Sequence, residues 1–122
     1  MLFLNLKEFY ENIGQNYEIV LKRMMGNEEF LYMLLGKFVS DTSIEALEKA
    51  MNSHEAAEIF EQAHTLKGVA ENLGMKPLYE KVSVLVEITR KGSVDGIDEV
   101  FAEVKQIYVE IINLLEIVTL EK

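Results

Sequence analysis

The residues of this chain that are best suited to chemistry lie close together, in the segment 63–74. His64, Lys67 and Gly68 stand at positions i, i+3 and i+4, a spacing that puts all three on one face of a helix. At about 100° per residue, the apolar side chains of the segment, such as Leu66, fall on the opposite side. We therefore expect His64 to face solvent, with a cation one turn further along.

These residue types suit the acceptance of a phosphoryl group. A neutral imidazole on a solvated face has one nitrogen free to act as a nucleophile, and we expect the exposed Nε2 of His64 to be that atom. Lys67 can hold the phosphoryl oxygens as a mobile point charge. A glycine inside a helix lowers helix stability by roughly 1 kcal/mol relative to alanine, so the presence of Gly68 needs an explanation. It either lets the surface of another protein approach His64 or packs closely against a neighbouring helix.

Further residues on the same face form a candidate docking surface for a protein partner, and the helix expected at 76–91 should supply its other wall. The members predicted from the helical spacing are Ala57, Phe60, Glu61 and Glu71. The two carboxylates would repel a phosphoryl group unless they turn into solvent or pair. Glu71 can pair with Lys67 at i, i+4, but that contact would compete with the role of the lysine.

A metal site is another use of His64 that the sequence suggests. Glu61-Gln62-Ala63-His64 matches the Glu-x-x-His pattern of di-iron bundles, which need a second such pair and two further carboxylates. The only other histidine, His54, has Met51 three residues before it. The ligand count fails, so we expect no metal and no cofactor. His54 lacks a matching lysine–glycine pair, and we expect it to be merely exposed.

Composition limits the classes of function. A chain of 122 residues can bury a substantial core, and the absence of cysteine excludes disulfides, thiol catalysis and cysteine-based zinc sites. The formal net charge of −9 argues against nucleic acid or an anionic membrane as the main partner. No apolar run approaches the length of a membrane span, and the opening residues are too short for a secretory signal. The expected location is the cytoplasm.

Helical periodicity extends along nearly the whole chain. Asn27 is a plausible N-cap, the run 42–45 matches a capping box that begins at Thr42, and Gly74 followed by Pro77 indicates a helix end and a new start. The expected helices are 5–13, 15–25, 28–40, a short helix from Thr42 to near Asn52, a helix from after Asn52 or Ser53 to Gly74, 76–91, and 97–118.

Short loops between long amphipathic helices imply antiparallel neighbours. The predicted fold is all-α, an antiparallel up-down four-helix bundle of about residues 28–118. Additional short helices in residues 1–27 would pack on it, and residues 1–122 would form a single domain. Several aromatic and methionine side chains are predicted to lie in the core rather than at a cofactor: Phe30, Met33, Phe38 and Met75.

The run His64-Thr65-Leu66-Lys67-Gly68, followed by Leu73-Gly74, resembles the His-x-x-Lys-Gly signature of histidine-containing phosphotransfer (Hpt) domains. The resemblance covers about residues 28–118, including the helix order and the glycine–proline turn. It implies a phosphocarrier, with no catalysis of its own, that takes a phosphoryl group from the aspartate of one response-regulator receiver domain and passes it to another. Magnesium and the catalytic acidic residues would belong to the receiver.

The resemblance also assigns roles to single residues. His64 becomes the phosphoacceptor, Lys67 the cation that stabilises the phosphoryl group, and Gly68 the residue that gives the partner clearance. The implied partners are receiver domains or a hybrid histidine kinase, with the chain itself acting as a monomer. The competing hypothesis is a helical adaptor that keeps this fold and binds a signalling partner without phosphoryl transfer.

Overall fold

The computed structural model describes residues 3–119, and within them the chain forms seven α-helices, as the all-α prediction requires. The helices are α1 (Leu6–Asn12), α2 (Tyr17–Arg23), α3 (Glu28–Val39), α4 (Ser43–Ser53), α5 (Ala56–Asn72), α6 (Lys76–Arg90) and α7 (Ile97–Leu115).

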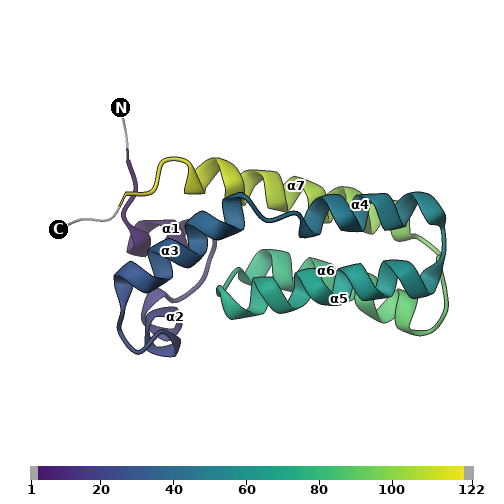
Figure 1. The fold of residues 1–122 in the computed structure, drawn as a ribbon, viewed down its shortest axis with the longest axis horizontal. Coiled ribbons are helices and arrows are strands. Elements are labelled where there is room, and N and C mark those ends of the chain that lie inside the picture. The colour runs from purple at the N-terminus through teal and green to yellow at the C-terminus, as the bar shows by residue number, and fades with distance from the viewer. Residues whose placement is uncertain (1–2, 120–122) are drawn as a thin grey trace.

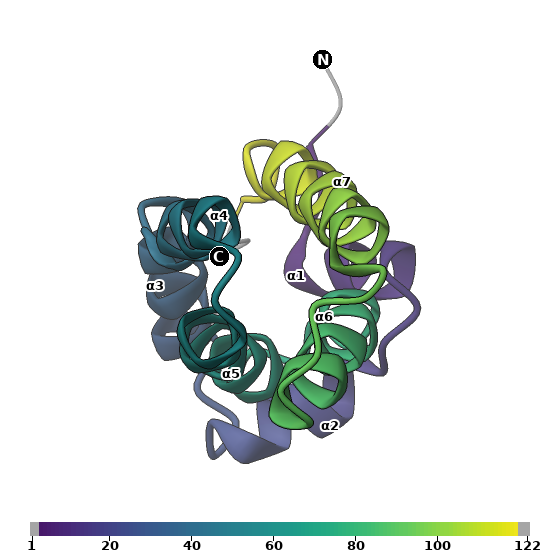
Figure 2. The ribbon, with the colours of Figure 1, turned by 90° about the vertical axis from the view of Figure 1, so that its right-hand side faces the viewer.

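Four helices, α4 to α7, lie side by side in a bundle whose circle is seen end-on in Figure 2. Helix α5 packs most extensively on α6, α6 packs on α7, and α4 closes the circle against both α5 and α7. Helix α3 lies behind α4 in the end view and also packs on α7 (Figure 1; Figure 2). Helices α3 and α4 therefore share one corner of the predicted four-helix bundle.

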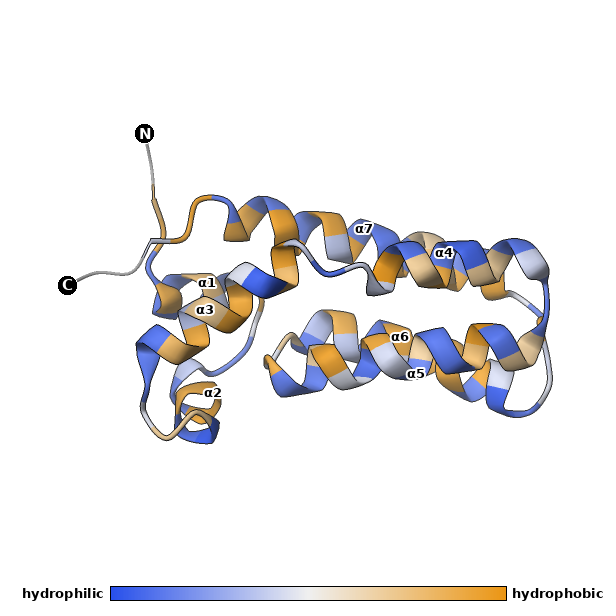
Figure 3. Ribbon diagram, viewed as in Figure 1, coloured by the Kyte–Doolittle hydropathy of each residue, from blue (hydrophilic) through white to orange (hydrophobic). Residues whose placement is uncertain are grey.

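The core is built from one face of each amphipathic helix. Hydrophobic and hydrophilic residues alternate along the helices in Figure 3, as this arrangement requires. Phe38 and Met75 are buried as predicted. The core prediction is wrong for Phe30 and Met33, which are 43% and 45% exposed. Helix α3 is covered mainly by α7, so only the face that carries Leu31 is shielded from water.

The helix ends agree with the sequence signals in part. The side chain of Asn27 accepts a hydrogen bond from the backbone N–H of Phe30 at 2.9 Å, so this cap is confirmed. The capping box at Thr42 is wrong, because the side chain of Thr42 makes no capping bond. The backbone of Thr42 lies near φ −100°, ψ 7°, outside the extended region that an N-cap residue adopts. Asp41 instead accepts from the N–H of Ser43 at 2.7 Å.

The last helix ends at Leu115, earlier than predicted, because the chain after it turns to meet the N-terminal segment. The N–H of Leu4 donates to the carbonyl of Ile117, and the N–H of Thr119 donates to the carbonyl of Leu4, both at 2.8 Å. Leu4 and Val118 thereby form an isolated parallel bridge.

Helices α1 and α2 lie at the end of the bundle where α5 turns into α6 (Figure 1). The hydroxyl of Tyr10 donates to the carbonyl of Leu73 at 2.7 Å, and Nη1 of Arg23 donates to the carbonyl of Glu71 at 2.8 Å. Carbonyls at the end of a helix have no partner within the helix. The N-terminal helices thus supply donors to the carbonyls that end α5.

The turn between α5 and α6 depends on Gly74. Its φ of +68° lies in the left-handed region, and Met75 donates back to the carbonyl of Ala70 at 2.9 Å, as in a glycine-ended helix. A Cβ on Gly74 would lie 2.3 Å from Cγ2 of Val20 in α2. The glycine therefore allows both the turn and the close approach of α2.

Gly74→Ala is expected to lower the free energy of unfolding by about 2–4 kcal/mol, because it combines left-handed strain with overpacking against Val20. Urea denaturation followed by circular dichroism measures the loss. Gly92→Ala is the control, since Gly92 has φ +78° but open space around it; only the strain of about 1–2 kcal/mol should appear there. Equal losses at the two positions would contradict the proposed contact with Val20.

Tyr10 links stability to alkaline pH. Burial raises the pKa of its phenol above the ordinary 10.0, and Tyr17 adds to this effect. Because the folded protein holds the protonated form, this contribution is complete below pH 10 and is lost as the pH rises further. Tyr10→Phe should cost about 1–2 kcal/mol at neutral pH through the unpaired carbonyl of Leu73. The variant should also lose less stability above pH 10 than the wild type, which urea denaturation across pH can measure. An unchanged slope would contradict the assignment.

Candidate functional site

Helix α5 fixes the direction in which the candidate residues point. Ile59, Ala63 and Leu66 on its inner face are fully buried in the bundle, which turns the opposite face outward. His64 lies on that outer face and is exposed. The predicted orientation of the imidazole is therefore what the structure has.

The space beside His64 is open at Gly68. A Cβ built on Gly68 would meet no heavy atom within 4 Å outside its own helix. No close packing against a neighbouring helix requires a glycine there. Of the two reasons that the sequence left open, this geometry favours clearance for an incoming surface.

An aromatic contact flanks the imidazole on one side. The rings of Phe60 and His64 have centroids 5.7 Å apart and planes tilted by 32°. The guanidinium of Arg90, which belongs to α6, lies over the Phe60 ring, with Cζ 5.1 Å from the ring centroid. Nε of Arg90 also lies 3.3 Å from Oε1 of Glu87.

A second contact between a cation and an aromatic ring lies on the other side of His64. Nζ of Lys67 is 5.5 Å from the centroid of the Tyr79 ring in α6. Among residues 3–119, Lys67 forms no ion pair with Glu71, so the competing pair that the sequence suggested is absent there. The backbone carbonyl of Glu71 is held by Arg23, as described above.

The other predicted docking residues, Ala57, Glu61 and Glu71, are exposed along α5, and Phe60 is half-buried. Tyr79 and Arg90 of α6 contact Lys67 and Phe60, so α6 borders the predicted docking surface.

Tyr79, Arg90 and Arg23 were not among the site residues predicted from the sequence. No signal in the wheel of α5 could have found them, because they come from other helices and reach this face only through packing.

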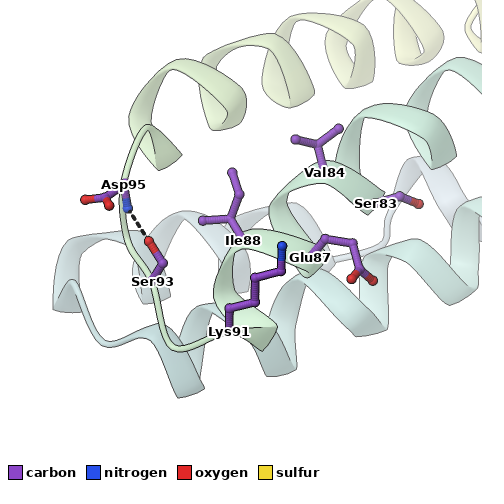
Figure 4. Close-up of a pocket in the computed structure, with 7 residues that line it drawn as sticks. All are labelled: Ser83, Val84, Glu87, Ile88, Lys91, Ser93 and Asp95. Atoms are coloured by element: carbon purple, nitrogen blue, oxygen red, sulfur yellow. Dashed lines mark hydrogen bonds between the residues drawn. The ribbon is translucent and has the colours of Figure 1, made fainter.

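Two clefts lie on the surface of α5 and α6 or next to it, and the first borders this face at Glu71 and Tyr79. One of about 370 Å³ lies between α2 and the α5–α6 turn, with Arg23, Glu71, Lys76 and Tyr79 among its lining residues. Another, of about 520 Å³, is shown in Figure 4. Its lining residues are Ser83, Val84, Glu87, Ile88, Lys91, Ser93 and Asp95. His64 lines neither cleft, so its position suits a protein surface better than an enclosed small molecule.

No group of three or more His, Cys, Asp or Glu side chains among residues 3–119 lies close enough together to hold a metal ion. None of the helices there has the length and apolar character that crossing a membrane requires.

Comparison with known proteins gives two matches. The model of the Hpt domain family matches residues 35–116 of this chain. Among solved structures, histidine-containing phosphotransfer protein B (HptB) from Pseudomonas aeruginosa PAO1 is similar, with a TM-score of 0.74 and 20% sequence identity. The similarity covers 84% of this chain and 90% of the HptB chain. No curated protein matches.

Proposed function

Because this chain belongs to the Hpt domain family, we propose that it relays a phosphoryl group between aspartates of response-regulator receiver domains through a phosphohistidine at His64. One observation carries the choice of residue. His64 is the exposed histidine beside the open space over Gly68, inside the matched range 35–116. Because no neighbouring helix fills the space over Gly68, the surface of a partner can approach the imidazole from that side.

The proposed step is a phosphoryl exchange. Nε2 of His64 attacks the phosphorus of an aspartyl phosphate, the N–P bond forms, and the acyl O–P bond breaks with the aspartate carboxylate as leaving group. The reverse reaction on a second receiver regenerates the imidazole. The chain contributes a positioned nucleophile and the charge near it, and does no autonomous chemistry.

Lys67 stabilises the transferred group in this proposal. Before transfer its ammonium rests over the ring of Tyr79, and a contact of this kind near the surface is worth only about 1 kcal/mol. Its attraction to a phosphoryl group, with a charge of about −1.5 to −2, offsets the loss of that contact. Since no ion pair with Glu71 holds it among the described residues, Lys67 can turn toward His64.

The docking surface for the receiver in this proposal centres on His64. It extends along α5 over Ala57, Phe60, Glu61 and Glu71, with α6 as its second wall. The proposed partners are receiver domains or a hybrid histidine kinase, and the proposed setting is the cytoplasm, with the chain acting as a monomer. A net charge of −9 disfavours nucleic acid as a partner.

His64→Gln is expected to abolish acceptance of the label from a phosphorylated cognate receiver. Transfer is followed by incubating a ³²P-labelled receiver with the chain and separating the two proteins. The melting temperature should stay close to that of the wild type, because the side chain is exposed.

His54→Gln is the matched control, since His54 is also exposed. This variant should accept label at the wild-type rate. If His64→Gln accepted label equally well, the site would be wrong. If neither the wild type nor His64→Gln took label but both bound the receiver, the adaptor hypothesis would replace the relay.

Substitutions at Gly68 should affect phosphoryl transfer and the free energy of unfolding differently. Gly68→Ala should raise the free energy of unfolding by about 0.5–1 kcal/mol, because alanine favours a helix and the space is open. Gly68→Leu should keep the fold and slow transfer from the receiver by about tenfold or more, by blocking its approach. Urea denaturation and ³²P transfer measure the two effects.

Gly36→Leu is the control for this pair, because Gly36 also lies within a helix with open space around it. It should leave transfer unchanged. A parallel loss of stability and transfer in Gly68→Leu would mean that the glycine serves the fold instead.

A further inference from the structure

Two contacts between a cation and an aromatic ring join α5 to α6, one on each side of His64. Lys67 rests on Tyr79 toward the end of α5, and Arg90 rests on Phe60 toward its start. The two contacts differ in what the aromatic ring touches. Of the two rings, Phe60 lies against the imidazole itself, with the ring centroids 5.7 Å apart.

We propose that Arg90 is a positioning residue for His64 and acts through Phe60, an inference that rests on the proposed function. The guanidinium of Arg90 covers the Phe60 ring, and the Phe60 ring lies against the imidazole. The three side chains form a row of contacts that begins with Arg90 on α6 and ends at the His64 imidazole on α5.

An exposed imidazole needs such support because its side chain can turn in solvent. Exposed side chains change rotamer in picoseconds to nanoseconds, and a nucleophile that points in many directions reacts more slowly than one held in line. His64 is exposed, and a Cβ on the neighbouring Gly68 would meet nothing within 4 Å. The Phe60 ring is the aromatic wall against which the imidazole can rest.

Phe60 is in turn held by a cation that does not depend on the partner. Arg90 lies with Nε 3.3 Å from Oε1 of Glu87 on its own helix, so its guanidinium is anchored at one edge while its face covers the ring. Arginine suits this position because its planar group can stack and pair at the same time. The ring position near His64 is therefore decided by α6 as well as by α5.

The test uses phosphoramidate, a small phosphoryl donor that needs no docking surface. Nε2 of His64 attacks its phosphorus, the P–N bond breaks, and ammonia leaves. Arg90→Gln should slow this phosphorylation by roughly two- to fivefold, the factor that matches a surface cation–π contact. A role confined to docking an acidic receiver would slow transfer from the receiver and leave the phosphoramidate rate unchanged.

A spectroscopic readout follows the ring directly. Phe60→Leu should shift the Hδ2 and Hε1 resonances of His64 most, because the ring current of Phe60 is removed. Arg90→Gln should shift them in the same direction by a smaller amount, and Arg90→Lys should restore part of both the shift and the rate.

Lys91→Gln is the matched control, because it removes an equal charge from the adjacent position. Lys91 lines the cleft of Figure 4, and this variant should leave both readouts at wild-type values.

The positioning role is overturned if Arg90→Gln keeps the wild-type His64 resonances and phosphoramidate rate, or if Lys91→Gln changes them equally. Circular dichroism confirms that each variant is folded. Failure of the proposed function looks different, since the wild type itself would then take no phosphoryl group at His64 from either donor.

Discussion

The packing of α5 against α6 is the interaction on which the other features of this protein depend. The buried face of α5 carries Ile59, Ala63 and Leu66, which are fully shielded from water. Burial of this face directs the opposite one outward, because residues on a helix keep a fixed angular spacing. The same packing brings Tyr79 and Arg90 of α6 beside the outer face. The orientation of His64 and its surroundings therefore have one cause.

The two cations beside His64, Lys67 and Arg90, differ in whether a carboxylate pairs with them. In a chain with net charge −9, Lys67 and Arg90 both rest on aromatic rings, and within residues 3–119 only Arg90 also meets a carboxylate, that of Glu87. An aromatic face holds a cation weakly when it is exposed. The contact with Tyr79 orders the side chain of Lys67 without neutralising its charge, which suits the proposed acceptance of an anionic group.

The N-terminal helices support the end of the same helix that carries His64. Tyr10 and Arg23 donate to carbonyls of Leu73 and Glu71, and Val20 fills the space that Gly74 leaves open. Each of these contacts joins residues more than 45 positions apart. They tie α1 and α2 to the turn that sets the direction of α6, and through α6 to the second wall of the proposed docking surface.

The sequence by itself determined the helical class, most helix positions and the placement of His64, Lys67 and Gly68 on one outward face. These properties follow from spacing within single helices. Only the tertiary structure decided which cations and rings surround the imidazole, because Arg90 and Tyr79 lie on another helix and their register follows from packing. The tertiary structure also explains why the predictions at Thr42 and Phe30 were wrong. A capping box needs a backbone angle that the α3–α4 connection does not adopt, and an apolar side chain is buried only where a neighbour covers its face.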